Sequence, residues 1–153
     1  MPAALLLCLV VGITDGDTLK ARCATEPART LTIRLAEIDA PEKGQPFGNR
    51  SKQHLASLCF GQEAGVRRTA TDRYGRTVAR VSCAGIDANA AMVQAGMAWA
   101  FTKYLSDSRI KDMELAARRE QVGLWRDASA MPPWNWRNRT PASIAENGER
   151  AGL

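Results

Sequence analysis

The sequence predicts an α+β domain of mainly β character, in which five strands close into a small barrel and three α-helices complete the fold. Five runs of β-prone or alternating apolar residues and three runs with helical spacing support this class. The first helical run falls after the third strand. The length of 153 residues favours one domain, and an apolar content of 45% is enough for a core at this size.

Three strands come first. Residues 8–13 and 18–22 flank an Asp-Gly turn, which is a strong hairpin signal. Residues 30–38 alternate Leu31, Ile33 and Leu35 with polar side chains, as a half-buried strand does.

A helix, two strands and two helices follow. Residues 49–59 place Leu55, Leu58 and Cys59 at helical spacing before Gly61. Residues 64–71 and 77–83 read as strands around a turn at 72–76, and residues 87–94 and 106–121 as helices that end before Gly96 and Gly123. Five antiparallel strands with a helix inserted after the third suit a small closed barrel of the OB type.

The single domain is expected to span residues 8–137. Residues 1–7 form a short apolar segment, and residues 138–153 are expected to be a flexible tail. The apolar start over residues 1–11 resembles a signal-peptide core but lacks a basic n-region and a clear cleavage site. No apolar run is long enough to cross a bilayer, so no membrane association is expected.

The chain has four cysteines, Cys8, Cys23, Cys59 and Cys83. No Cys-x-x-Cys pair and only one histidine are present, which disfavours a zinc site. Cys8 and Cys23 lie at equal distances from the Asp-Gly turn and would face each other in the hairpin, while Cys59 ends a helix and Cys83 ends a strand. The pattern favours two disulfides and a secreted or periplasmic protein over four free thiols in the cytosol.

Acidic residues in a basic chain are the first functional signal. The net charge of +5 suits a polyanionic partner, yet carboxylates beside phosphates need a cation between them. Asp15 and Asp17 stand at the hairpin tip, and Asp39 and Glu42 follow the third strand; pairing of that strand with the hairpin would bring Asp17 and Asp39 to one barrel rim. Two carboxylates, a backbone carbonyl and waters make a partly open Ca²⁺ site, whereas plain solvated turns are the alternative.

Arginines supply the second signal. Arg34 points away from its apolar neighbours on a strand, and Arg76 follows a turn that Gly75 permits, so each could hold a phosphate or simply form a surface ion pair. Arg73 and Tyr74 add a charge and a ring that could contact a nucleotide.

Taken together, these motifs resemble the thermonuclease (staphylococcal nuclease) family. The resemblance runs from about residue 9 to 125, and its most specific segments are residues 13–18, 34–42, 72–76, 93–98 and 123–125. It implies an OB-fold barrel with three helices and a Ca²⁺-dependent phosphodiesterase that hydrolyses DNA and RNA as a monomer, with little sequence specificity, leaving 3′-phosphate ends.

The resemblance also implies roles for individual residues. Asp17, Asp39 and the backbone carbonyl of Ala40 match metal ligands, although the family often has Thr at the last position, and Asp15 matches an acid that supports the metal-bound waters. Glu42 matches the residue usually assigned as general base, and Arg34 and Arg76 match phosphate-binding arginines. Substrate contacts are implied for Arg73, Tyr74 and Tyr104.

A binding module is the rival hypothesis: an OB barrel that holds single-stranded nucleic acid without cutting it. Some domains that resemble this family have lost their acids and arginines. Here every one of those positions is filled, which favours the enzyme.

Overall fold

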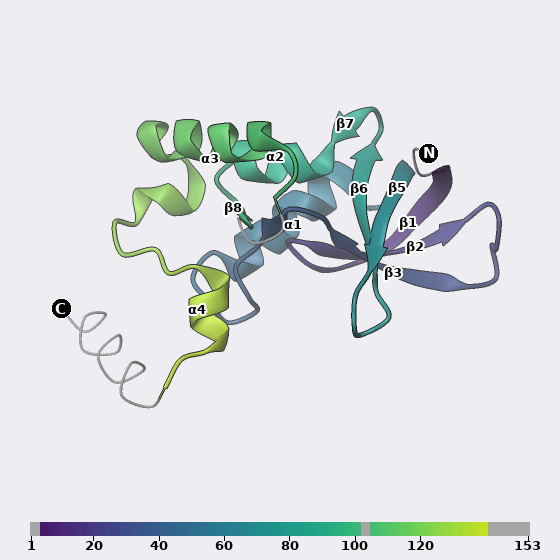
Figure 1. Cartoon of the computed structure of the whole chain (residues 1–153), viewed down its shortest axis with the longest axis horizontal. Helices are drawn as coiled ribbons and strands as arrows, with labels where there is room; N and C mark the ends of the chain where they lie inside the picture. The colour runs from purple at the N-terminus through teal and green to yellow at the C-terminus, as the bar shows by residue number, and fades with distance from the viewer. Residues whose placement is uncertain (1–3, 102–104, 141–153) are drawn as a thin grey trace.

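Five strands close into a barrel in the computed structural model, which describes residues 4–101 and 105–140. They are β1 (Leu5–Asp15), β2 (Thr18–Cys23), β3 (Thr30–Leu35), β5 (Glu63–Thr71) and β6 (Thr77–Cys83), and Figure 1 shows them gathered at one end of the molecule. The sheet order is β3-β2-β1-β5-β6, and an additional β3–β6 pairing closes it. The predicted mainly-β OB-type barrel is therefore confirmed.

The closing pair differs from the expected pattern because β3 and β6 run parallel, with Ile33 opposite Thr77 and Leu35 opposite Ala79. The other barrel pairs are antiparallel, as predicted. An odd number of strands in a closed ring cannot alternate direction throughout, so one pair has to be parallel.

The three predicted helices are α1 (Gly48–Cys59), α2 (Ala88–Gln94) and α3 (Ser108–Glu120). Asp87 and Asp107 cap α2 and α3 by accepting backbone N–H bonds from Ala90 and Arg109. A 3₁₀ turn, η2 (Gly123–Arg126), and a short helix, α4 (Pro133–Arg137), follow. Figure 1 shows α3 and α4 on the side of the molecule away from the barrel strands.

The predicted third strand breaks after Leu35. Glu37 has a positive φ of 69°, and its carboxylate accepts hydrogen bonds from the backbone of Ser106 and Asp107 at 2.6 Å each. Because this turn interrupts the ladder, residues 38–39 form a separate strand, β4 (Ile38–Asp39), paired with β8 (Trp99–Ala100). Another short strand, β7 (Ile86–Asp87), pairs antiparallel with the end of β6.

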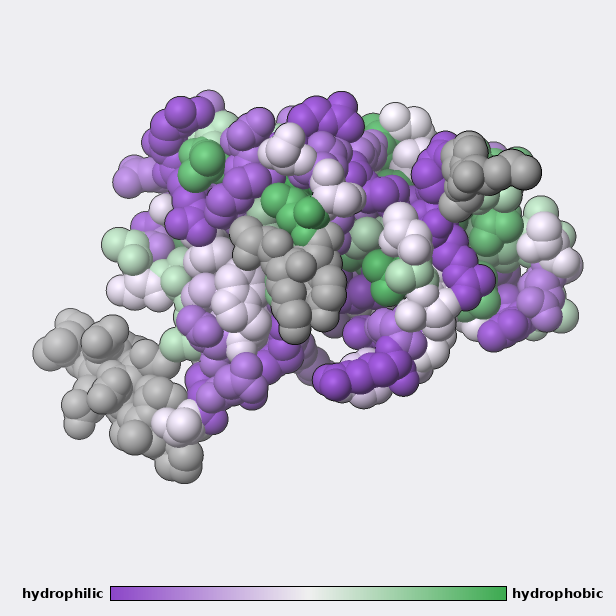
Figure 2. Space-filling model, viewed as in Figure 1, coloured by the Kyte–Doolittle hydropathy of each residue, from purple (hydrophilic) through white to green (hydrophobic). Residues whose placement is uncertain are grey.

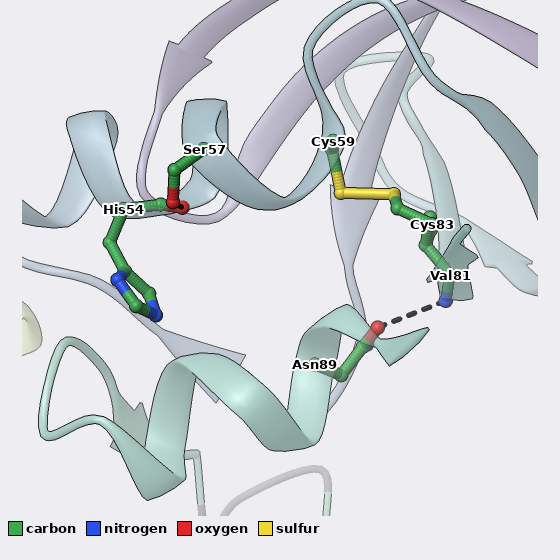
Figure 3. Close-up of a disulfide and its surroundings, with 6 residues drawn as sticks. All are labelled: His54, Ser57, Cys59, Val81, Cys83 and Asn89. Carbon is green, nitrogen blue, oxygen red and sulfur yellow. Dashed lines mark hydrogen bonds between the residues drawn. A yellow bond between two sulfur atoms is a disulfide. The ribbon is translucent and has the colours of Figure 1, made fainter. Parts of the chain in front are cut away.

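Two disulfides, Cys8–Cys23 and Cys59–Cys83, tie these elements together. Cys8 pairs with Cys23 across the β1–β2 ladder, as the hairpin symmetry predicted. Figure 3 shows the second disulfide joining the end of α1 to β6, beside the hydrogen bond from the Val81 N–H to the Asn89 side chain. The helix that covers the barrel is thus covalently fixed to it.

The core fills the barrel and extends under the helices. Fully buried large side chains include Leu19, Ile33, Leu55, Met92 and Ile110. Figure 2 shows a largely hydrophilic outer face with smaller apolar patches. Among the residues that the structure describes, the helices are too short or too polar to cross a membrane.

Candidate active site

Asp17 is the buried acid at the tip of the β1–β2 hairpin, with 6% of its surface exposed. Its Oδ2 accepts the Ala40 backbone N–H at 2.7 Å, and its Oδ1 accepts the Thr18 hydroxyl at 3.0 Å. A Cβ at Gly16 would collide with the Ser51 hydroxyl and lie 2.8 Å from the Ala40 Cβ. The tip therefore packs against α1 only because residue 16 has no side chain.

Asp39 and Asp17 both lie beside the guanidinium of Arg34. Asp39 lies on β4 with no exposed surface. The Arg34 Nη2 is 3.4 Å from the Asp39 Oδ1 and 3.5 Å from the Asp17 Oδ2, while its Nη1 donates to the Leu35 carbonyl at 2.6 Å. The structure thus brings together the two acids and the strand arginine that the sequence singled out.

Asp15 lies beside this pair at the hairpin tip, where its Oδ1 accepts the Asp17 backbone N–H at 3.1 Å. Burial, and next the charge of Asp17, raise the pKa of Asp15 to about 7. A buried carboxyl group whose pKa is raised beside a second acid is typical of a functional site.

The pKa values of Asp17 and Asp39 shift in opposite directions. Burial alone would raise the pKa of Asp17, but the charge of Arg34 and the hydrogen bonds that Asp17 accepts outweigh it, so this pKa falls. Burial raises the pKa of Asp39, because its bonds to Arg137 and the charge of Arg34 only partly offset burial and the repulsion from Asp17.

Glu42 lies in the loop before α1. Its backbone N–H donates to the Gln45 Oε1 at 2.9 Å, and its side chain is 33% exposed. The Glu42 Oε1 accepts from the Arg137 Nη1 at 2.5 Å. The same guanidinium also binds both oxygens of Asp39, at 2.7 and 3.2 Å.

Arg76 lies in the β5–β6 turn and is held there by Asp72. Its Nε is 2.6 Å from the Asp72 Oδ2, and its backbone N–H donates to the Oδ1 at 2.9 Å. The next residue, Thr77, pairs with Ile33, which precedes Arg34. Arg76 thus emerges at the end of β6 that adjoins Arg34, and among the described residues its ion pair is with Asp72 rather than with the acids at the hairpin tip.

The same turn presents the predicted nucleotide contacts. The Tyr74 ring is 69% exposed, with the Arg73 and Arg76 guanidinium carbons 5.0 and 5.6 Å from its centre. Such a pair of cations on an exposed ring suits contact with a base and its phosphate. Tyr104 lies outside the described residues.

Arg137 is the site residue that the sequence did not reveal. The predicted domain ended at this residue, and residues 138–153 were expected to be a flexible tail. Pro133 at the first position of α4 is a helix-start signal, but a helix of five residues has too little periodicity to detect. Nothing in the sequence pairs Arg137 with two acids roughly a hundred positions away.

The donor set fits a hard cation. Within residues 4–101 and 105–140 no cluster of three or more acidic, histidine or cysteine side chains is poised as a complete metal site. Asp17 and Asp39 nevertheless lie within 3.5 Å of one Arg34 nitrogen, next to the Ala40 backbone. Two carboxylates and a carbonyl, completed by water, suit Ca²⁺, which takes six to eight oxygen ligands in flexible geometry.

The fold and the site define a class: an OB-fold protein whose barrel rim carries buried carboxylates and arginines. A family model described as staphylococcal nuclease homologue matches residues 32–127. The chain belongs to this family. The matched segment contains Arg34, Asp39, Glu42 and Arg76; it begins after Asp17 and ends before α4.

Relatives extend the likeness beyond that segment. A micrococcal nuclease of Shigella flexneri is 45% identical over 139 residues, covering 84% of this chain and 78% of the relative. An uncharacterized endonuclease of Haemophilus influenzae is 40% identical, covering 90% and 76%. The staphylococcal-like nuclease CAN1 of Arabidopsis thaliana is 34% identical, covering 72% of this chain and 34% of the plant protein.

Proposed function

We propose that this chain is a nuclease that hydrolyses DNA and RNA with Ca²⁺ as its cofactor and with little sequence specificity. The observation that carries the proposal is the pair of buried acids, Asp17 and Asp39, held around Arg34 at the barrel rim. Membership of the nuclease family and relatives named as nucleases support the reaction class. The choice of Ca²⁺ rests on the oxygen donors.

In this proposal Asp17, Asp39 and the Ala40 carbonyl would hold the ion, and Asp15 would support the site from beside Asp17. When bound, Ca²⁺ withdraws charge from a phosphate oxygen and favours deprotonation of a water. Glu42 accepts the proton of the attacking water. Its partly exposed carboxylate at the mouth of the site suits this role.

The two arginines stabilise the charge that builds up on the phosphate. Arg34 has five N–H donors, of which the contacts in the described structure use only those on Nη1 and Nη2, so Nε–H is available. Arg76 is held through Nε by Asp72, which leaves its Nη groups for a phosphate oxygen. Donors fixed in advance cost little reorganisation when the transition state forms.

Arg73, Tyr74 and Tyr104 are proposed to contact the nucleotide chain, and departure of the 5′ oxygen would leave 3′-phosphate ends. We also propose that the protein acts as a monomer and is secreted or periplasmic. The two disulfides are compatible with an oxidising compartment.

The test is plasmid DNA and a single-stranded RNA incubated with protein in Ca²⁺ and, separately, in EGTA. Cleavage of both substrates only with Ca²⁺ is expected, and phosphatase treatment of the products should release a terminal phosphate from the 3′ end. Retarded but uncut DNA in Ca²⁺ would instead support the binding module.

A further inference from the structure

Arg137 occupies Asp39, one of the two acids that the proposed metal ion would need. Its guanidinium forms a two-point contact with Asp39, Nη2 to Oδ2 at 2.7 Å and Nη1 to Oδ1 at 3.2 Å. The same Nη1 also reaches Glu42. Asp39 has no exposed surface, so these contacts use both oxygens of a buried carboxylate.

The position of Arg137 is set by the packing of α4. Trp134 on this helix stacks on Phe101, with ring centres 5.6 Å apart, and meets the edge of Trp99 at 5.7 Å. Trp99 is the strand partner of Asp39 across β4 and β8. The helix that carries Arg137 is therefore packed against the strand pair that carries Asp39.

A second link joins the start of α4 to the loop of Glu42. The Gln45 Nε2 donates to the Met131 carbonyl at 2.7 Å, and the Gln45 Oε1 accepts the Glu42 N–H at 2.9 Å. Gln45 is itself buried, with 7% exposed. One buried amide thus fixes the distance between the Glu42 loop and the segment that leads into α4.

A cation that binds Asp39 has to take at least one of the oxygens that Arg137 holds. We propose that Arg137 is a further residue of the metal site, an internal counter-ion that sets its affinity by occupying Asp39 and Glu42 when the ion is absent. This inference rests on the proposed function, because it takes Asp39 as a metal ligand. Metal binding then requires the guanidinium to give up at least one of its two contacts with Asp39, while the contact with Glu42 can persist.

The size of the effect is limited by solvent. The Arg137 side chain is 41% exposed, so its ion pairs are partly screened, although Asp39 is not. If the ion pair between Arg137 and Asp39 contributes about 1 kcal/mol, removing the Arg137 guanidinium raises the affinity of the site for Ca²⁺ about fivefold.

The experiment is calorimetric titration of the purified full chain with Ca²⁺, comparing wild type with Arg137→Ala. Arg139→Ala is the matched control. Arg139 lies two positions after Arg137 and carries the same charge, but its guanidinium lies over the Trp136 ring and its Nε donates to the Trp136 carbonyl. Asp39→Ala locates the ion, and thermal melts in EGTA establish that each variant is folded. We expect Arg137→Ala to bind Ca²⁺ about fivefold tighter and Arg139→Ala to stay within about twofold of wild type.

Each other outcome is decisive. Equal tightening in both arginine variants would show a general charge effect and overturn the inference, as would unchanged or weaker binding in Arg137→Ala. If wild type binds Ca²⁺ and Asp39→Ala does not, either of these arginine-variant results overturns the inference but leaves the proposed metal role intact. If wild type binds no Ca²⁺, the proposed metal role fails as well.

Discussion

Replacing Arg34 should lower both the stability of the protein and its kcat. Added Ca²⁺ should restore part of the stability but not the kcat. The Arg34→Met variant keeps an apolar stem of similar length and removes the guanidinium that lies within 3.5 Å of Asp17 and Asp39. Both acids are buried, so the change leaves two carboxylates without the cation they share.

The magnitude follows from the remaining contacts. Removing one partner of a buried ion pair costs about 3–5 kcal/mol. Here Asp39 keeps Arg137, and Asp17 keeps its bonds from Ala40 and Thr18. We therefore expect the unfolding free energy in EGTA to fall by about 2–3 kcal/mol, with part of that loss recovered in saturating Ca²⁺ because the ion replaces the missing charge.

Urea unfolding followed by tryptophan fluorescence, in EGTA and in Ca²⁺, measures the first effect. Initial rates of DNA hydrolysis in saturating Ca²⁺ measure the second, and kcat should fall at least about 10²-fold, as for loss of one transition-state donor. A stability change below about 0.5 kcal/mol, the range of ordinary surface substitutions, would refute the shared-cation argument. A loss of kcat under about threefold would remove Arg34 from the catalytic residues.

Further predictions concern the acids and a disulfide. Asp17→Ala and Asp39→Ala should each weaken Ca²⁺ binding in calorimetry, and unchanged affinity would refute the metal assignment. Because the pKa of Asp15 is raised to about 7, the folded protein holds a proton that the unfolded chain releases above about pH 4. In EGTA this acid should therefore lower stability progressively from about pH 4 to 7, so Asp15→Asn should gain about 1–2 kcal/mol over wild type at pH 8, after allowance for partial exposure, and little at pH 4. Urea unfolding at both pH values checks this, and a gain independent of pH would contradict it. Replacing Cys59 and Cys83 together by Ser should lower the unfolding free energy by about 3 kcal/mol for a separation of 24 residues, measured by the same unfolding curves; a loss below about 1 kcal/mol would show that the disulfide adds little.

The barrel could be predicted because its signals are local. Alternation in β3, the Asp-Gly turn between β1 and β2 and the glycine that follows α1 each depend on a few neighbouring residues. The disulfide between Cys8 and Cys23 followed from the same hairpin, since equal spacing from a turn places two residues opposite each other.

The break in the third strand after Leu35 could not be predicted, because it depends on contacts with residues distant in sequence. The turn at Glu37 is held by the backbone of Ser106 and Asp107, some seventy positions away, and no local pattern shows that a carboxylate will accept those bonds. Asp39 was expected at a barrel rim, yet it is fully buried, paired with Trp99 on β8 and held by Arg137 on α4, and no short motif connects it to either element.

Arg137 is the clearest case of the same limit. Its residue type is common, its helix is short, and its partners Asp39 and Glu42 were interpreted without it. The packing of Trp134 against Trp99 and Phe101, together with the hydrogen bond from Gln45 to Met131, brings this arginine to the acids.

The central claim is that the acids at the barrel rim bind Ca²⁺ for hydrolysis. The most direct test is the initial rate of cleavage of a 5′-labelled single-stranded oligonucleotide over a buffered range of free Ca²⁺, for wild type and Asp39→Ala. The account predicts no cleavage in EGTA, a rate that saturates at the Ca²⁺ concentrations found by calorimetry, and a shift to higher Ca²⁺ in the variant. Full cleavage in EGTA, or a bound oligonucleotide that stays uncut at every Ca²⁺ concentration, would contradict it.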